Sequence, residues 1–102
     1  MELHTFSSLN LDFLKLYHKS MSYADDAFVY FNEETLLHKR LEKIEKKDVY
    51  DAFGTSNLKV FTSSKELQSQ LFSKDWTNSN LLMMSSGTFD GLDFNKIADK
   101  II

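Results

Sequence analysis

The spacing of apolar residues changes along this chain and predicts an alternation of strands and helices. Residues 27–31, Ala-Phe-Val-Tyr-Phe, form a continuous apolar run, which is typical of a strand buried on both faces. Stretches at residues 2–6, 58–61 and 80–84 indicate three further strands. Because helical segments separate them, we expect an α/β fold with a mostly parallel, layered sheet. The strand residues expected to be buried include Phe28, Tyr30, Leu58, Val60, Leu82 and Met84.

Helical spacing and capping residues define the segments between the predicted strands. Apolar residues recur at helical spacing over residues 13–21. The highly charged segment 33–51 favours two short helices, and Gly54 is a suitable stop for the second. Ser63 begins a Ser-x-x-Glu capping box, and Asp93 is placed to cap a last helix.

Composition limits the classes of function that the chain can serve. The 102 residues suit one domain, and 12 basic against 15 acidic residues give a net charge of −3. This balance argues against a nucleic-acid partner and against an anionic membrane surface. The absence of cysteine excludes disulfides, thiolate catalysis and cysteine-based zinc sites. With no signal-like or membrane-spanning apolar segment, we expect a cytoplasmic protein.

A loop of small residues, 85–91, is the most informative local feature. It follows a predicted strand and leads into a predicted helix, which places it at the carboxyl edge where open α/β sheets bind ligands. Its Gly-x-x-x-Gly spacing differs from the dinucleotide fingerprint and from the P-loop. Ser86, Gly87 and Gly91 are therefore candidate ligand contacts, with a tight turn that only reverses the chain as the alternative.

A second cluster of polar residues follows the first predicted strand. His4, Thr5 and Ser7 are candidates for positioning a substrate, and a strand-end histidine followed by helix N-caps is the alternative interpretation. Both clusters follow strands and precede helices, so we expect them to lie side by side at one edge of the sheet. No nucleophile–base–orienter series is present, and His18 and His38 lack partners at metal-ligand spacing. We therefore assign no catalytic residue and no metal ligand to this chain.

Three stretches together resemble the C-terminal domain of the Mur ligases. Residues 2–8, Glu-Leu-His-Thr-Phe-Ser-Ser, resemble the family's (Glu/Gln)-Pro-His-x-(Phe/Tyr)-(Ser/Thr)-Arg segment. Residues 24–29, Ala-Asp-Asp-Ala-Phe-Val, are similar to the family's entry to its next strand. Residues 81–91 look like the Met-Ser-(Asn/Ser)-Gly-x-Phe-x-Gly ending of the murein-peptide ligases, and the UDP-N-acetylmuramate–L-alanine ligases are the other close branch.

The resemblance implies one part of a larger enzyme. Mur ligases have an N-terminal domain for the UDP-sugar, a central domain for ATP and magnesium, and a Rossmann-like, three-layer C-terminal domain that presents the incoming amine. They activate a carboxylate as an acyl-phosphate, which the amine of an amino acid or peptide then attacks, in peptidoglycan biosynthesis or recycling and hence in cell-wall biogenesis, cell shape and the cell cycle. On this interpretation residues 1–102 are a partial C-terminal domain, truncated on its N-terminal side, which binds neither ATP nor magnesium and is inactive alone.

The chain departs from the family pattern in its first motif. Thr5 and Ser8 stand where the family has arginines, and Leu3 replaces a proline. If those arginines hold the incoming carboxylate, that hold must come from elsewhere here, which favours the murein-peptide branch over the alanine-adding branch. The resemblance carries over His4 from the first motif and Ser86, Gly87 and Gly91 from the last. A stand-alone, non-catalytic α/β binding or regulatory module is the alternative function.

Overall fold

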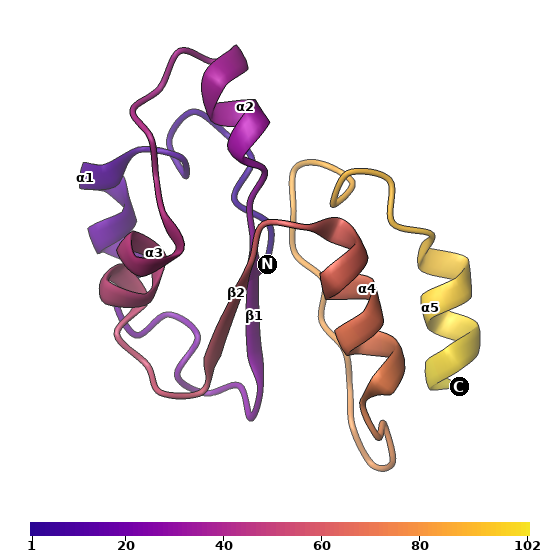
Figure 1. Ribbon diagram of the computed structural model, residues 1–102. Helices are drawn as coiled ribbons and strands as arrows, with labels where there is room; N and C mark the ends of the chain where they lie inside the picture. The colour runs from indigo at the N-terminus through magenta and orange to yellow at the C-terminus, as the bar shows by residue number, and fades with distance from the viewer.

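Two parallel strands form the centre of the computed structural model, which describes residues 1–102 (Figure 1). Strand β1 pairs with β2 in a register that places Ala27 opposite Leu58 and Tyr30 opposite Phe61. The elements in chain order are α1 (Leu11–Leu14), the 3-10 helix η1 (Lys15–Tyr17), β1 (Ala27–Tyr30), α2 (Glu33–His38), α3 (Lys46–Phe53), β2 (Leu58–Phe61), α4 (Ser64–Ser73) and α5 (Phe94–Ile101). The chain is thus a small α/β fold, as its apolar pattern predicts.

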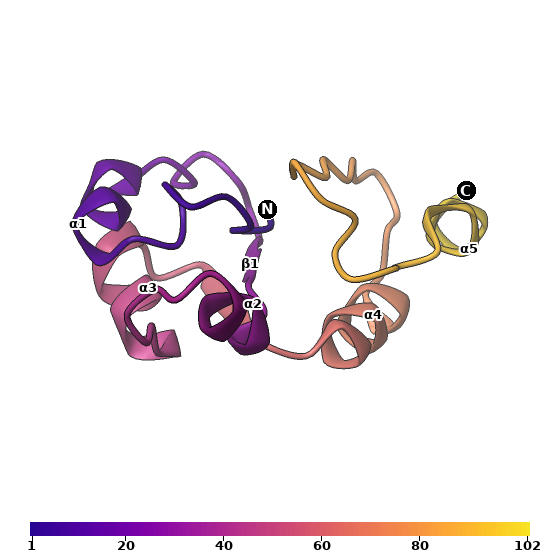
Figure 2. The ribbon, with the colours of Figure 1, turned by 90° about the horizontal axis from the view of Figure 1, so that it is seen from above.

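Helices lie on both sides of the two strands, since β1 is apolar on both faces (Figure 2). Ala27 and Val29 point toward α1 and α3, where they join a buried cluster that includes Leu14. Phe28 and Tyr30 point the other way, toward α4 and α5. This alternation follows from the period of two in a strand, and it explains why residues 27–31 are apolar without interruption.

The N-terminal residues lie alongside β1 as a short extended segment. Tyr30 N–H donates to the Met1 carbonyl at 2.9 Å, and Leu3 N–H donates to the Tyr30 carbonyl at 2.8 Å. On the far side of this segment, Glu2 N–H donates to the Met84 carbonyl at 2.9 Å. Residues 1–3 therefore lie between β1 and Met84.

Two of the four predicted strands are not formed. In place of a strand over residues 2–6 there is one isolated bridge, between Glu2 and Tyr30, because the chain turns at Thr5, whose carbonyl accepts the Leu9 N–H. In place of a strand over residues 80–84 there is an irregular segment, whose one backbone bond is that of Met84 to Glu2.

The burial expected for the irregular segment is also wrong. Leu82 is 73% exposed and Met84 is 37% exposed, because no regular strand covers either side of residues 80–84. Among the other four strand residues expected to be buried, Tyr30, Leu58 and Val60 are buried, and Phe28 is half-buried.

The predicted helix boundaries after β1 are confirmed. Residues 33–53 form two helices, and the second ends at Gly54, whose φ of +63° is the left-handed conformation that favours glycine. Ser63 and Asp93 cap α4 and α5 through their side-chain oxygens. The first helix is shorter than its apolar spacing predicts, because Lys19 N–H donates to the Phe53 carbonyl at 2.8 Å and turns the chain away.

Leu14 and Leu16 provide a matched test of the core beneath α1. Leu14 is 1% exposed and Leu16 is 73% exposed. We expect Leu14→Ala to lower the free energy of unfolding by about 3 kcal/mol, because it removes buried methyl groups and leaves a cavity. Leu16→Ala is the control and should change it by less than about 0.5 kcal/mol. Urea unfolding followed by circular dichroism measures both, and equal losses would contradict this packing.

The α-amino group of Met1 predicts a pH dependence of stability. It is hydrogen-bonded to the Phe28 carbonyl at 2.8 Å, and burial lowers its pKa from 8.0 to about 6. Between these values the unfolded chain binds a proton that the folded chain does not. Stability is therefore complete above pH 8 and falls by roughly 2 kcal/mol as the pH decreases to 6.

Urea unfolding at pH 6 and pH 8 measures this effect. An N-terminally acetylated chain is the control, because its amide does not titrate. Acetylation should remove most of the difference between the two pH values. A difference of the same size in both forms would assign the pH dependence to other groups.

Candidate functional site

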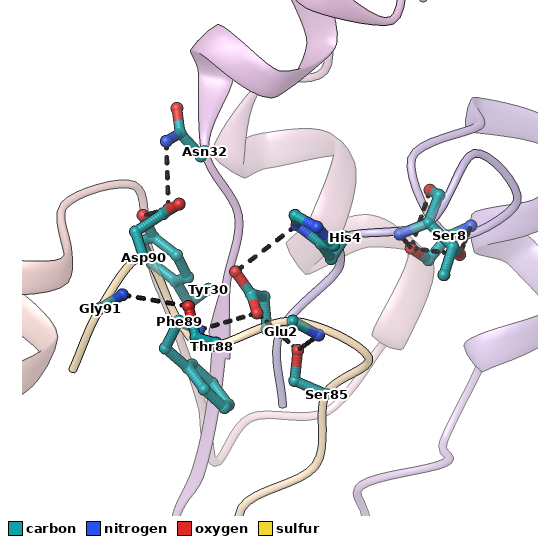
Figure 3. Close-up of polar contacts among 12 residues, drawn as sticks. Glu2, His4, Ser8, Tyr30, Asn32, Ser85, Thr88, Phe89, Asp90 and Gly91 are labelled. Carbon is teal, nitrogen blue, oxygen red and sulfur yellow. Dashed lines mark hydrogen bonds and ion pairs between the residues drawn. The ribbon is translucent and has the colours of Figure 1, made fainter. Parts of the chain in front are cut away.

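The two polar segments predicted to be neighbours do lie side by side at one edge of the sheet (Figure 3). Ser85 Oγ donates to Glu2 Oε1 at 2.5 Å, which fastens the start of the loop 85–91 to the N-terminal segment. Gly87 packs against Glu2 and His4, since a Cβ added at Gly87 would lie 2.9 Å from Glu2 Oε1 and 3.1 Å from the imidazole ring. A side chain at position 87 would therefore displace the buried carboxylate and the histidine, which explains the glycine.

The Glu2 carboxylate is buried between the two segments of the site. Glu2 is 5% exposed, and its Oε1 also accepts the backbone N–H of Phe89 at 3.0 Å. Its Oε2 has no hydrogen-bond donor and lies 3.8 Å from His4 Nδ1 (Figure 3). Because a buried carboxylate is costly without partners, these contacts hold Glu2 and both loops in one arrangement.

A second set of hydrogen bonds holds the far half of the loop. Tyr30 Oη donates to Asp90 Oδ2, and Asn32 Nδ2 donates to the same oxygen at 3.0 Å. Burial raises the pKa of Tyr30, as do its bond to Asp90 and the nearby negative charges, so the phenol remains a donor. Phe89 and Asp90 both have a positive φ, of +53° and +54°, and these side-chain contacts hold the strained pair in place.

The turn at residues 5–8 is closed on itself. Ser8 N–H donates to Thr5 Oγ1 at 3.1 Å, and Thr5 N–H donates to Ser8 Oγ at 3.0 Å. The Thr5 hydroxyl is therefore occupied within the turn. Ser7 is exposed and makes no side-chain hydrogen bond.

The predicted site residues thus fall into two groups. His4 and Gly87 are in contact, and the His4 side chain is 39% exposed at the mouth of the site. Ser86 is exposed on the same loop. Gly91 is set apart, with a φ of +85°, no atom within 4 Å of an added Cβ, and its N–H bound to Thr88. Its glycine serves the backbone turn into α5.

Sequence reasoning missed four polar residues of this region. Glu2 opens the family-like motif, but a lone acid in a short apolar segment gives no sign of burial. Asn32, Tyr30 and Asp90 contact one another only through folding, because about 60 residues of chain separate the first two from the third. The one available signal was the position of Asp90 inside the loop.

A lysine and an exposed aromatic ring lie beside the turn. The ammonium group of Lys39, at the end of α2, lies 4.2 Å from the centre of the Phe6 ring. Phe6 is 60% exposed, which is unusual for a phenylalanine in a chain of this size. The pair places a cation next to the turn at residues 5–8.

A cavity of about 720 Å³ opens on the other side of the loop. Ser85, Gly87 and Phe89 form its wall on the loop side, and Ile97 and Ile101 of α5 form the opposite wall. Most of its lining is hydrophobic. The polar groups available to a ligand here are therefore those of the loop 85–91 and of His4.

No group of three His, Cys, Asp or Glu side chains is placed to hold a metal ion. None of the helices has the length and apolar character needed to cross a bilayer. Comparison with protein-family models, with curated proteins and with solved structures finds no match. The geometry itself therefore carries the functional argument.

Glu2 can be tested by two substitutions that differ in what they keep. Glu2→Ala leaves the buried Phe89 N–H without an acceptor, so we expect a loss of about 2 kcal/mol of stability. Glu2→Gln keeps an oxygen for that N–H and should cost less than about 1 kcal/mol. Thermal unfolding measures both, and equal losses would show that the charge, not the acceptor, holds the loop.

Proposed function

We propose that this chain is the amine-substrate-presenting domain of an ATP-dependent ligase of the Mur type, with a Rossmann-like, three-layer architecture. In this proposal the ligase joins UDP-N-acetylmuramate to an amino acid or peptide in the cytoplasm. ATP, magnesium and the UDP-sugar bind to other domains of the ligase. The observation that carries the proposal is that His4 and the buried Glu2 both lie against Gly87. It joins the two stretches whose resemblance to the family suggests a substrate site.

The position of Lys39 supports the choice of an acidic peptide as the substrate. The first motif lacks arginines, yet a peptide with free carboxylates needs a cation nearby. Lys39 supplies one beside the turn, where the exposed Phe6 ring holds its ammonium group. Such a cation attracts a carboxylate most strongly when it is partly shielded from water, and Lys39 is half-buried.

The other end of the site suits the ammonium end of such a peptide. Asp90 is exposed, and its carboxylate is held in place by Tyr30 and Asn32. We propose that a peptide bound between Lys39 and Asp90 also contacts His4, which Figure 3 shows between Asp90 and the turn at Ser8. The imidazole there can accept or donate a hydrogen bond, depending on its protonation state.

A titration of the isotope-labelled chain with L-alanyl-γ-D-glutamyl-meso-diaminopimelate tests the proposal. We expect NMR shifts for the amides of residues 4–8 and 85–91, and no shifts with magnesium ATP. Lys39→Gln should weaken tripeptide binding about fivefold, which is roughly 1 kcal/mol.

Lys43→Gln is the matched control. Lys43 is 74% exposed, pairs with Glu45 and should not affect the peptide. The proposal fails if the tripeptide leaves both loops unchanged. It also fails if the two lysine variants bind the tripeptide equally well, because the cation would then lie elsewhere.

A further inference from the structure

A slot runs between β1 and residues 80–84, in line with residues 1–3. It is a cavity of about 540 Å³. Met1 closes its upper end, Phe28 lines one side, and Leu82 and Met84 line the other. At the level of Met1 and Glu2 the same space is filled by the N-terminal segment, which binds Tyr30 on one side and Met84 on the other. The slot therefore begins where residues 1–3 end at Met1, and it extends from there alongside β1.

The β1 wall of the slot carries an unused backbone donor. Ala27 and Phe31 direct their N–H groups toward β2, where they bind the carbonyls of Asn57 and Phe61 at 3.1 Å. Tyr30 N–H points the opposite way, to Met1. Because N–H directions alternate along a strand, Phe28 N–H also points into the slot, where no acceptor reaches it.

The opposite wall, residues 80–84, has even fewer backbone hydrogen bonds. The Met84 carbonyl, bound to Glu2, is the one backbone group of residues 80–84 with a partner. Leu82 and Met84 are exposed whereas Leu81 and Met83 are half-buried, which is the side-chain alternation of an extended segment. We therefore expect the N–H of Met84 to lie on the same side as its carbonyl, toward the slot, and the N–H of Met83 to lie on the other side. Both walls therefore present unpaired main-chain groups to the same space.

The remaining two faces of the slot are mostly apolar, although the ion pair of Lys74 with Asp26 also lines the cavity. Leu67, Leu71 and Trp76 cover one face from the side of α4. Met21 and Ala24 lie on the other face. A segment placed here would be buried above and below while its backbone paired on both edges. These are the surroundings of a central strand in a parallel sheet, which is apolar throughout.

We infer that this slot binds an extended apolar peptide of about four residues, running parallel to β1 with its C-terminal end at Met1. The peptide completes the sheet between β1 and residues 80–84, and its side chains fill both apolar faces. The unpaired donors on two facing walls select a peptide backbone over a small apolar molecule, which would leave them unsatisfied. The inference does not depend on the proposed ligase role.

The test joins Ile-Val-Val-Ile directly before Met1. A chain with Gly-Ser-Gly-Ser in the same place is the control, because both extensions convert the Met1 ammonium group to an amide. We expect the apolar extension to raise the unfolding midpoint above that of the control. It should also slow hydrogen exchange at the Phe28 and Met84 amides by about tenfold, with the Met83 amide unchanged.

Three results would overturn the inference. Equal exchange in the two extended chains would show that the slot does not take a strand. Protection of Leu81 and Met83 instead of Met84 would place the added strand on the outer edge. A dimer or larger species of the apolar chain in size-exclusion chromatography, without Phe28 protection, would show that the extension pairs between molecules.

Discussion

The hydrogen bonds of one buried carboxylate connect the first residues of the chain to its last loop. Glu2 Oε1 accepts from both Ser85 and Phe89, and the same residue's backbone bonds to Met84. These bonds fix the first half of the loop beside His4, because residues 80–84 make no other backbone hydrogen bond. The buried charge is costly, but its removal would leave buried donors unpaired.

The two apolar clusters depend on the same arrangement. The cluster around α1 and α3 is formed mainly by residues 3–60, and it packs on one side of the strands. The cluster around α4 and α5 includes Tyr30 and Phe89, so it forms only when the loop is in place. Phe89 is 3% exposed and anchors the loop to this cluster from within. The burial of Phe89 and the hydrogen bonds of Glu2 thus both hold the loop 85–91 in place.

The sequence was informative where local signals decide the structure. The apolar run at residues 27–31, the stop at Gly54 and the caps at Ser63 and Asp93 each depend on nearby residues, and the structure has all of them. Strands over residues 2–6 and 80–84 were predicted wrongly, because a strand needs partners on its edges and the pattern of side chains does not report them. The two loops are neighbours as expected, although the strands over residues 2–6 and 80–84 from which this was argued are not formed. The roles of the Glu2 carboxylate and the Tyr30–Asp90 pair were not predicted. They depend on contacts between residues far apart in the chain.

The hydrogen bonds of Glu2 also bear on the order in which the molecule folds. They join residues separated by 83 and 87 positions, nearly the length of the chain. Such contacts close large loops and form slowly compared with the helices and the β1–β2 pair. During synthesis the segment that contains Glu2 emerges well before its partners Ser85 and Phe89, which follow 83 and 87 positions later. The mouth around His4 is therefore assembled at the end of folding, on a core of residues 9–60 that can collapse before it.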